Sequence, residues 1–128
     1  MSSDFVLDAG AFVAAERADR RWVVLWDHLV RSGVVPLVPA EVVSEVWRGG
    51  PRAARIARVL AASEVVDLTH GRARAIGELC GRARTSNPVD ASVVLVATPR
   101  RATVVTSDPE DIRRLADTTG AELPIITL

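Results

Sequence analysis

The fold is decided by the stretch Phe5-Val6-Leu7-Asp8-Ala9-Gly10. Its apolar first half ends on Asp8, and residues 11–15 continue in a helical pattern. A short apolar strand that runs directly into a helix opens an α/β unit. In open α/β sheets, ligands bind beyond the carboxyl ends of the strands. We therefore expect Asp8 at such an end, either as a helix N-cap or as part of a binding site.

Length and composition favour one cytoplasmic domain spanning residues 1–128. The chain has 128 residues, 48% of them hydrophobic, which is enough for a continuous core. Its first residues lack the basic segment of a signal peptide, and no apolar run reaches the roughly 20 residues that a membrane span needs. Cys80 is the only cysteine, and no Cys/His metal spacing occurs, so zinc is not indicated.

The basic residues narrow the function classes. All sixteen are arginine, since the chain contains no lysine. The absence of lysine excludes P-loops, phosphoacceptor receiver domains and haloacid-dehalogenase-like phosphatases, which rely on one. Arg52, Arg55 and Arg58 repeat at helical spacing, and this stripe is either a solvated face or a phosphate-binding one. Guanidinium groups are well suited to phosphate.

Apolar runs alternate with helical patterns along the rest of the chain. Such βαβ units predict a mostly parallel sheet. Pro36 argues that its strand lies at an edge or contains a bulge. After the first strand and helix, we expect strands at 34–38, 64–68, 102–106 and 124–128, and helices at 22–30, 40–48, 51–60, 70–84, 88–97 and 112–117.

Three more carboxylates are expected near the end of the sheet where Asp8 lies. Asp108 follows a strand directly, and Asp90 lies in the first turn of a helix that is apolar nearly all round. Glu45 borders the apolar side of helix 40–48, where Glu41 competes with it for a site role. Each has a simpler explanation: Asp90 and Asp108 as helix caps, and Glu45 as a partner of Arg48.

A cluster of four carboxylates has a chemical consequence. Unpaired carboxylates within a few ångströms repel, and without cations some must take up protons at neutral pH. A hard divalent cation removes the conflict, and oxygen-only ligands favour Mg²⁺ or Mn²⁺. The pattern therefore indicates metal-assisted phosphodiester chemistry.

Four blocks of the sequence resemble a PIN-domain ribonuclease, in particular the bacterial VapC-type toxins. The resemblance implies a PIN-like three-layer sandwich and a metal-binding quartet of Asp8, Glu45, Asp90 and Asp108, with Asp111 as an auxiliary acid. The blocks are Phe5-Val6-Leu7-Asp8, Pro39-Ala40-Glu41-Val42-Val43-Ser44-Glu45-Val46-Trp47-Arg48, Pro88-Val89-Asp90-Ala91 and Val105-Thr106-Ser107-Asp108-Pro109-Glu110-Asp111-Ile112.

The resemblance also implies an activity and partners. These are Mg²⁺- or Mn²⁺-dependent endoribonuclease activity on structured RNA such as tRNA or ribosomal RNA, a homodimer, and a small cognate antitoxin that forms a hetero-oligomer with the toxin. Arg48, Arg52 and Arg55 are our candidates for RNA contacts. Many relatives carry a hydroxyl residue directly after the first Asp, where this chain has Ala9-Gly10. The corresponding hydrogen bond is then either missing or supplied by Thr106, Ser107 or water.

Two other functions stay open at this point. One is a PIN-like module that has lost catalysis and only binds RNA or protein. The other is a non-nuclease α/β module in which every acid is a helix cap, and it predicts no response to metal.

Overall fold

The computed structural model describes residues 3–128, and its centre is a five-stranded sheet. The strand order is β3-β2-β1-β4-β5, and each neighbouring pair is parallel. The mostly parallel sheet predicted from the sequence is therefore confirmed. The strands are β1 (Phe5–Leu7), β2 (Leu37–Pro39), β3 (Glu64–Val66), β4 (Thr103–Thr106) and β5 (Ile125–Thr127).

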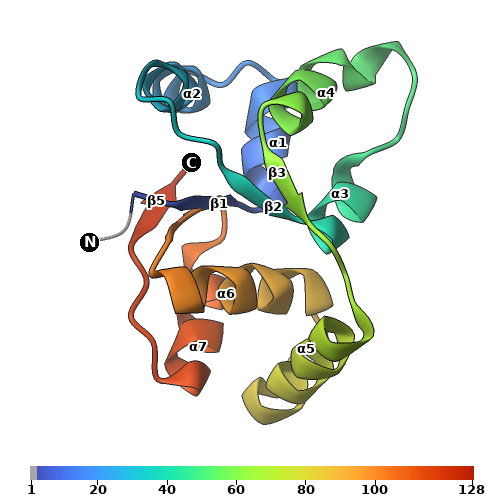
Figure 1. The fold of residues 1–128 in the computed structure, drawn as a ribbon, viewed down its shortest axis with the longest axis vertical. Coiled ribbons are helices and arrows are strands. Elements are labelled where there is room, and N and C mark those ends of the chain that lie inside the picture. Colours follow the sequence, from blue (N-terminus) through green and yellow to red (C-terminus); the bar gives the residue numbers. More distant parts are fainter. Residues whose placement is uncertain (1–2) are drawn as a thin grey trace.

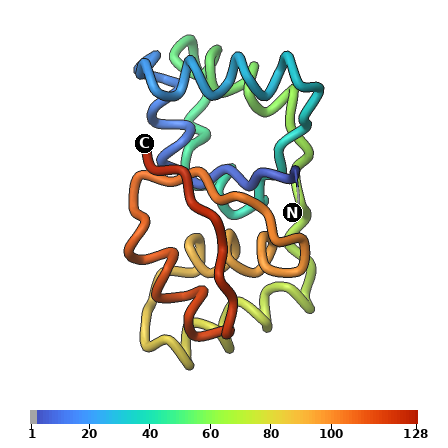
Figure 2. Tube along the Cα trace, turned by 90° about the vertical axis from the view of Figure 1, so that its left-hand side faces the viewer, coloured from blue at the N-terminus to red at the C-terminus, as the bar shows by residue number. Residues whose placement is uncertain are grey.

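Helices cover both faces of the sheet, which gives the three layers of the predicted sandwich (Figure 1). One layer holds α1 (Ala9–Glu16), α2 (Arg20–Arg31) and α4 (Ala54–Ala61). The other holds α5 (His70–Ala83), α6 (Pro88–Arg100) and α7 (Pro109–Thr119). The perpendicular view in Figure 2 shows the same two layers. The short helix α3 (Ala40–Val46) follows β2, and a 3-10 turn, η1 (Pro51–Ala53), precedes α4.

The winding of the chain changes direction between β1 and β4. From β1 the sheet grows through β2 to β3 on one side, whereas β4 and then β5 are added on the other. The helix after β1 and the helix after β4 lie on opposite faces of the sheet (Figure 1). Because the two following segments diverge, we expect a crevice beyond the carboxyl ends of β1 and β4, where ligands bind in open α/β sheets.

The core is continuous through both layers. Helix α6 packs against the sheet between α5 and α7, and its residues 90–94, 96 and 97 are buried, in line with its apolar character on all sides. Trp22 of α2 is buried and stacks on Trp26, with 5.3 Å between the ring centroids. Burial of Asp90 and Ser92 places two polar residues of α6 inside the protein.

Two features of the sequence were interpreted wrongly. β2 lies between β1 and β3, so Pro36 does not mark an edge strand. It precedes the strand, where its carbonyl still accepts a hydrogen bond from Glu64 N at 2.8 Å. Helix α6 continues through Pro99 instead of ending before it. A proline in the last turn removes few helical hydrogen bonds.

Element ends differ by a few residues elsewhere: α3 stops at Val46 and α7 starts at Pro109. None of the helices in residues 3–128 is long and apolar enough to cross a membrane.

Candidate active site

Asp8 lies at the carboxyl end of β1, as expected, and is only 4% exposed. Its Oδ1 accepts a hydrogen bond from Ala9 N at 2.6 Å at the start of α1. Its Oδ2 accepts one from the Thr106 hydroxyl at 2.7 Å. Burial raises the pKa of Asp8, and the hydrogen bonds from Thr106 and Ala9 oppose that rise. Asp8 is thus both an N-cap and a buried acid that faces β4, its neighbour in the sheet.

Thr106, the last residue of β4, connects Asp8 with Asp108. Its hydroxyl donates to Asp8 and accepts from Asp108 N at 3.0 Å, and the residue is fully buried. The chain lacks a hydroxyl directly after Asp8, and the Thr106 hydroxyl fills the hydrogen-bonding role that we had assigned to Thr106, Ser107 or water. A single hydroxyl therefore orients one carboxylate and the backbone of another.

Asp108 occupies the N-cap position of α7, yet its side chain makes no capping hydrogen bond. Its side chain is exposed and lies beside that of Asp111, one turn into the helix. The hydrogen bond between the side chains of Asp108 and Asp111 raises the pKa of Asp108, and burial and the charges of Asp111 and Asp8 raise it further, while the backbone of Asp111 opposes the rise. Asp108 thus faces a second carboxylate, which a helix cap alone does not require.

Asp90 is bound twice by Asn87 at the start of α6. Asn87 Oδ1 accepts from Asp90 N at 3.1 Å, and Asn87 Nδ2 donates to Asp90 Oδ2 at 2.9 Å. Asn87 is thus the N-cap of this helix, and Pro88 lies in its first turn. Burial first, and then the charges of Asp8, Asp111, Asp108 and Glu45, raise the pKa of Asp90 to about 7.

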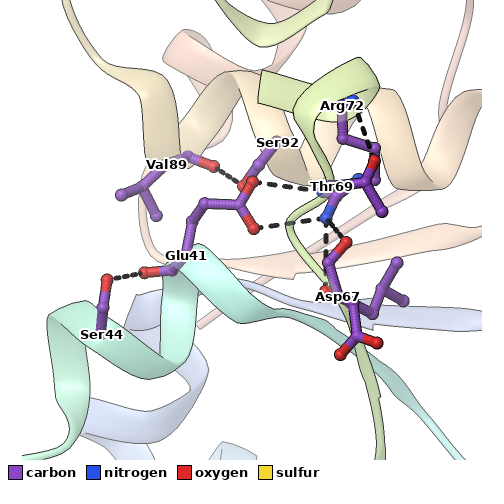
Figure 3. A network of polar contacts seen from close by, with 8 residues as sticks. Glu41, Ser44, Asp67, Thr69, Arg72, Val89 and Ser92 are labelled. Carbon is purple, nitrogen blue, oxygen red and sulfur yellow. Dashed lines mark hydrogen bonds and ion pairs between the residues drawn. The ribbon is translucent and has the colours of Figure 1, made fainter. Parts of the chain in front are cut away.

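Glu45 and Glu41 have different surroundings. Glu45 is exposed, and its charge acts on Asp90. Arg48 donates to the carbonyl oxygens of Ser44 and Trp47 rather than to Glu45. Glu41 instead pairs with Arg72 of α5, with 3.3 Å between Oε2 and Nη2 (Figure 3). The structure thus commits Glu41 to an ion pair and leaves Glu45 beside the acids.

The structure brings four of the predicted acids into electrostatic range of the fifth, Asp90. Asp90 lies among the other four, since each of them raises its pKa. Within residues 3–128, however, no three Asp, Glu, His or Cys side chains converge tightly enough to hold an ion on their own. This arrangement suits Mg²⁺ better than it suits an ion that needs all its ligands from the protein. Mg²⁺ is usually held by one or two carboxylates and several waters. The donor set, five carboxylates with no nitrogen or sulfur, fits a hard cation.

Two cavities are lined in part by α3, one by Glu45 and the other by Val46. The first, of about 390 Å³, is also lined by Ser107, Leu128 and residues of α1 and its flanks. The second, of about 400 Å³, is also lined by Arg48, Arg52 and the Gly49 region. Arg55 is exposed, donates to Glu16 O at 2.8 Å and lines neither of these two cavities. Two of the three predicted RNA-binding arginines, Arg48 and Arg52, therefore line one hollow.

Sequence reasoning missed two residues that shape this region. Arg72 lies 31 positions from Glu41, and no local pattern links them. Gly10 packs closely against Ser107, which lies on the loop after a different strand. Both contacts depend on strand order, and only a prediction of the order β3-β2-β1-β4 would have revealed them.

The comparisons with known proteins agree with this fold. The PIN domain model matches residues 5–118, and the chain therefore belongs to the PIN domain family, whose members are generally nucleases. None of the curated proteins compared with it gave a significant match.

Solved structures share the fold at low sequence identity. VapBC2 from Rickettsia felis, bound to a DNA fragment from its promoter, has a TM-score of 0.70 and 15% identity, covering 98% of both chains. FitAcB from Neisseria gonorrhoeae has a TM-score of 0.65 and 14% identity, covering 96% of both chains. PAE2754 from Pyrobaculum aerophilum has a TM-score of 0.57 and 20% identity, covering 95% of this chain and 91% of that one.

Proposed function

We propose that this chain is a single-domain, Mg²⁺- or Mn²⁺-dependent endoribonuclease and the toxin of a toxin-antitoxin pair in the cytoplasm. The observation that carries the proposal is the position of Asp90. Its pKa of about 7 results from burial and from four surrounding carboxylates. Clustered carboxylates repel one another in the folded protein, and a bound divalent cation would relieve that repulsion. We assign the ligand role to Asp8, Asp90, Asp108 and Glu45, with Asp111 as auxiliary acid.

The residues divide the work of such a site. A bound metal ion would supply a water of lowered pKa and neutralise charge that develops on the phosphate. Asp8 and Asp90 are the buried acids, and their orientation is fixed by Thr106 and Asn87 respectively. Asp108 and Glu45 are exposed at the rim, where they can reach an ion from the solvent side. Asp111, beside Asp108, can hold a proton that the reaction releases.

An acidic pocket repels RNA unless cations offset its charge. We assign the binding of the phosphates that flank the cleaved bond to Arg48, Arg52 and Arg55, of which Arg48 and Arg52 line one hollow. Single-stranded loops expose their backbones and bases, so a loop of a tRNA or ribosomal RNA is the substrate class we favour.

The structurally similar proteins support the proposal of an antitoxin partner. VapBC2 and FitAB are each described as bound to DNA fragments. By analogy, we propose that a small antitoxin binds this chain and blocks the acidic pocket, with an arginine side chain among the carboxylates. We further propose that the toxin forms a homodimer, alone or within the toxin-antitoxin complex.

The test is product analysis with a labelled RNA hairpin, with EDTA and with Mn²⁺. We expect cleavage in the loop only with metal, leaving a 3′-hydroxyl and a 5′-phosphate, because a metal-held water is the nucleophile. A 2′,3′-cyclic phosphate would show that the 2′-hydroxyl of the RNA attacked, and would contradict the mechanism. RNA binding without cleavage under any metal would favour an inactive binding module.

A further inference from the structure

Gly10 lies in the first turn of α1, against the loop that follows β4. A Cβ atom built on Gly10 would lie 2.8 Å from Ser107 N and 2.9 Å from Ser107 Cβ, and would also clash with Ser107 Oγ. Contacts this short do not occur in real structures, and a backbone atom cannot move aside as a flexible side chain can. Any residue other than glycine would therefore push this loop away from α1.

The backbone conformation does not explain the glycine. Gly10 is absent from the glycines of positive φ, which are Gly33, Gly49, Gly50 and Gly120. Within a helix, glycine is less favourable than alanine by roughly 0.5–1 kcal/mol. The close approach of Ser107 is thus the feature of the fold that requires glycine at this position.

The displaced loop would carry Asp108 with it. Asp108 follows Ser107 directly, and its N–H donates to Thr106 Oγ1 at 3.0 Å. The same hydroxyl donates to Asp8 Oδ2 at 2.7 Å. The packing of Gly10 against Ser107 therefore holds together the two chain segments that carry Asp8 and Asp108, at the carboxyl ends of β1 and β4.

We propose that Gly10 is a positioning residue: its missing side chain lets the Ser107–Asp108 loop approach α1 and sets the distance between Asp8 and Asp108 that a divalent cation needs. This inference rests on the proposed function, because the cation is part of that proposal. Gly10 itself contributes no ligand atom.

The experiment compares Gly10→Ala with Gly77→Ala. Gly77 is an exposed helical glycine of α5, and a Cβ atom added to it would meet nothing within 4 Å, so it controls for the change in helix propensity. Hydrogen exchange of the Asp108 amide is measured without metal, and Mn²⁺ affinity is measured by calorimetry. We expect Gly10→Ala to lower the protection of Asp108 and the Mn²⁺ affinity by at least tenfold each, and Gly77→Ala to change neither.

The outcomes separate this inference from the proposed function. Asp108 protection and Mn²⁺ affinity within twofold of wild type in Gly10→Ala would overturn the inference. A wild-type protein that binds no Mn²⁺ would overturn the proposed function and, with it, the role of Gly10 toward the cation. If Gly10→Ala does not fold, Gly10→Ala/Ser107→Gly is measured against Ser107→Gly alone. Partial recovery of folding and of Asp108 protection supports the inference, because Oγ and Cβ of the clash are gone while the contact with Ser107 N remains, and a double variant no better folded than Gly10→Ala overturns it.

Discussion

Glu41 of α3 and Arg72 of α5 form a two-point contact, with Nη1 3.4 Å from Oε1 and Nη2 3.3 Å from Oε2 (Figure 3). Their side chains are only 10% and 22% exposed, respectively. Arg72 also donates to the carbonyl oxygens of Val66 and Asp67, at 3.3 Å and 2.6 Å. The pair therefore ties the start of α3 to the segment between β3 and α5, one helical turn before Glu45.

This contact distinguishes the roles of the two glutamates. We expect Glu41→Gln to lower the free energy of unfolding by about 1–3 kcal/mol, because the guanidinium loses its charged partner in a largely buried place. Mn²⁺ affinity should stay within about threefold. Glu45→Gln should do the reverse, leaving stability unchanged and weakening Mn²⁺ at least tenfold. Calorimetry and urea unfolding check both, and a Glu41→Gln that loses metal while Glu45→Gln keeps it would reverse the assignment.

The sequence predicted much of this architecture because local patterns encode it. Apolar runs and capping residues mark element starts, and Asn87 and Thr69 each cap a helix. The sequence also pointed to the acids, since carboxyl ends of parallel strands share one edge. Contacts across strands were not predictable in the same way. Thr106 was only one of three groups that could have supplied the hydrogen bond to Asp8. The Glu41–Arg72 and Gly10–Ser107 contacts depend on which elements become neighbours.

The acid cluster should make stability fall as pH rises. Burial and four neighbouring charges raise the pKa of Asp90 from 3.8 to about 7. The folded protein therefore holds a proton that the unfolded chain has lost between pH 4 and 7, and stability declines across this window. We expect a loss of up to a few kcal/mol from pH 5 to pH 8 in EDTA, measured by urea unfolding. Asp90→Asn should flatten the decline, and an equally steep decline in that variant would show that other groups cause it.

Thr106 should be sensitive to loss of its hydroxyl but not of its methyl group. Thr106→Val keeps the shape of the side chain but removes the hydrogen-bond partner of Asp8 Oδ2 and Asp108 N. We therefore expect the free energy of unfolding to fall by about 1–3 kcal/mol. Mn²⁺ affinity should fall as well, because both acids lose their orientation. Thr106→Ser keeps the hydroxyl and should retain metal affinity. The two variants are compared by thermal unfolding and calorimetry. Equal metal affinity in the Val and Ser variants would contradict the role of the Thr106 hydroxyl in orienting Asp8 and Asp108.

The three arginines proposed to contact RNA should determine the salt dependence of RNA binding. Replacement of Arg48, Arg52 and Arg55 by Gln should weaken binding and flatten the slope of log K against log salt by about 2, since each phosphate contact contributes roughly 0.7 for single strands. The matched control replaces Arg74, Arg82 and Arg113, which are exposed on α5 and α7. Fluorescence anisotropy with catalytically silent Ca²⁺ measures both. Identical slopes in the two triple variants would mean that the first set is only a solvated face.

The last prediction tests caps against metal ligands by stability rather than activity. If Asp90 and Asp108 served only as caps, their removal would cost about 1 kcal/mol with or without metal. In a crowded cluster, however, Asp→Asn relieves repulsion, so Asp90→Asn and Asp108→Asn should be neutral or more stable than wild type in EDTA. Mn²⁺ at a hundred times its dissociation constant should stabilise the wild type by about 2.7 kcal/mol and the two variants much less. Asp117→Asn, at an exposed position late in α7, is the control and should respond like wild type. Thermal unfolding in EDTA and in Mn²⁺ measures all four proteins. Equal metal responses in all of them would show that neither aspartate is a ligand.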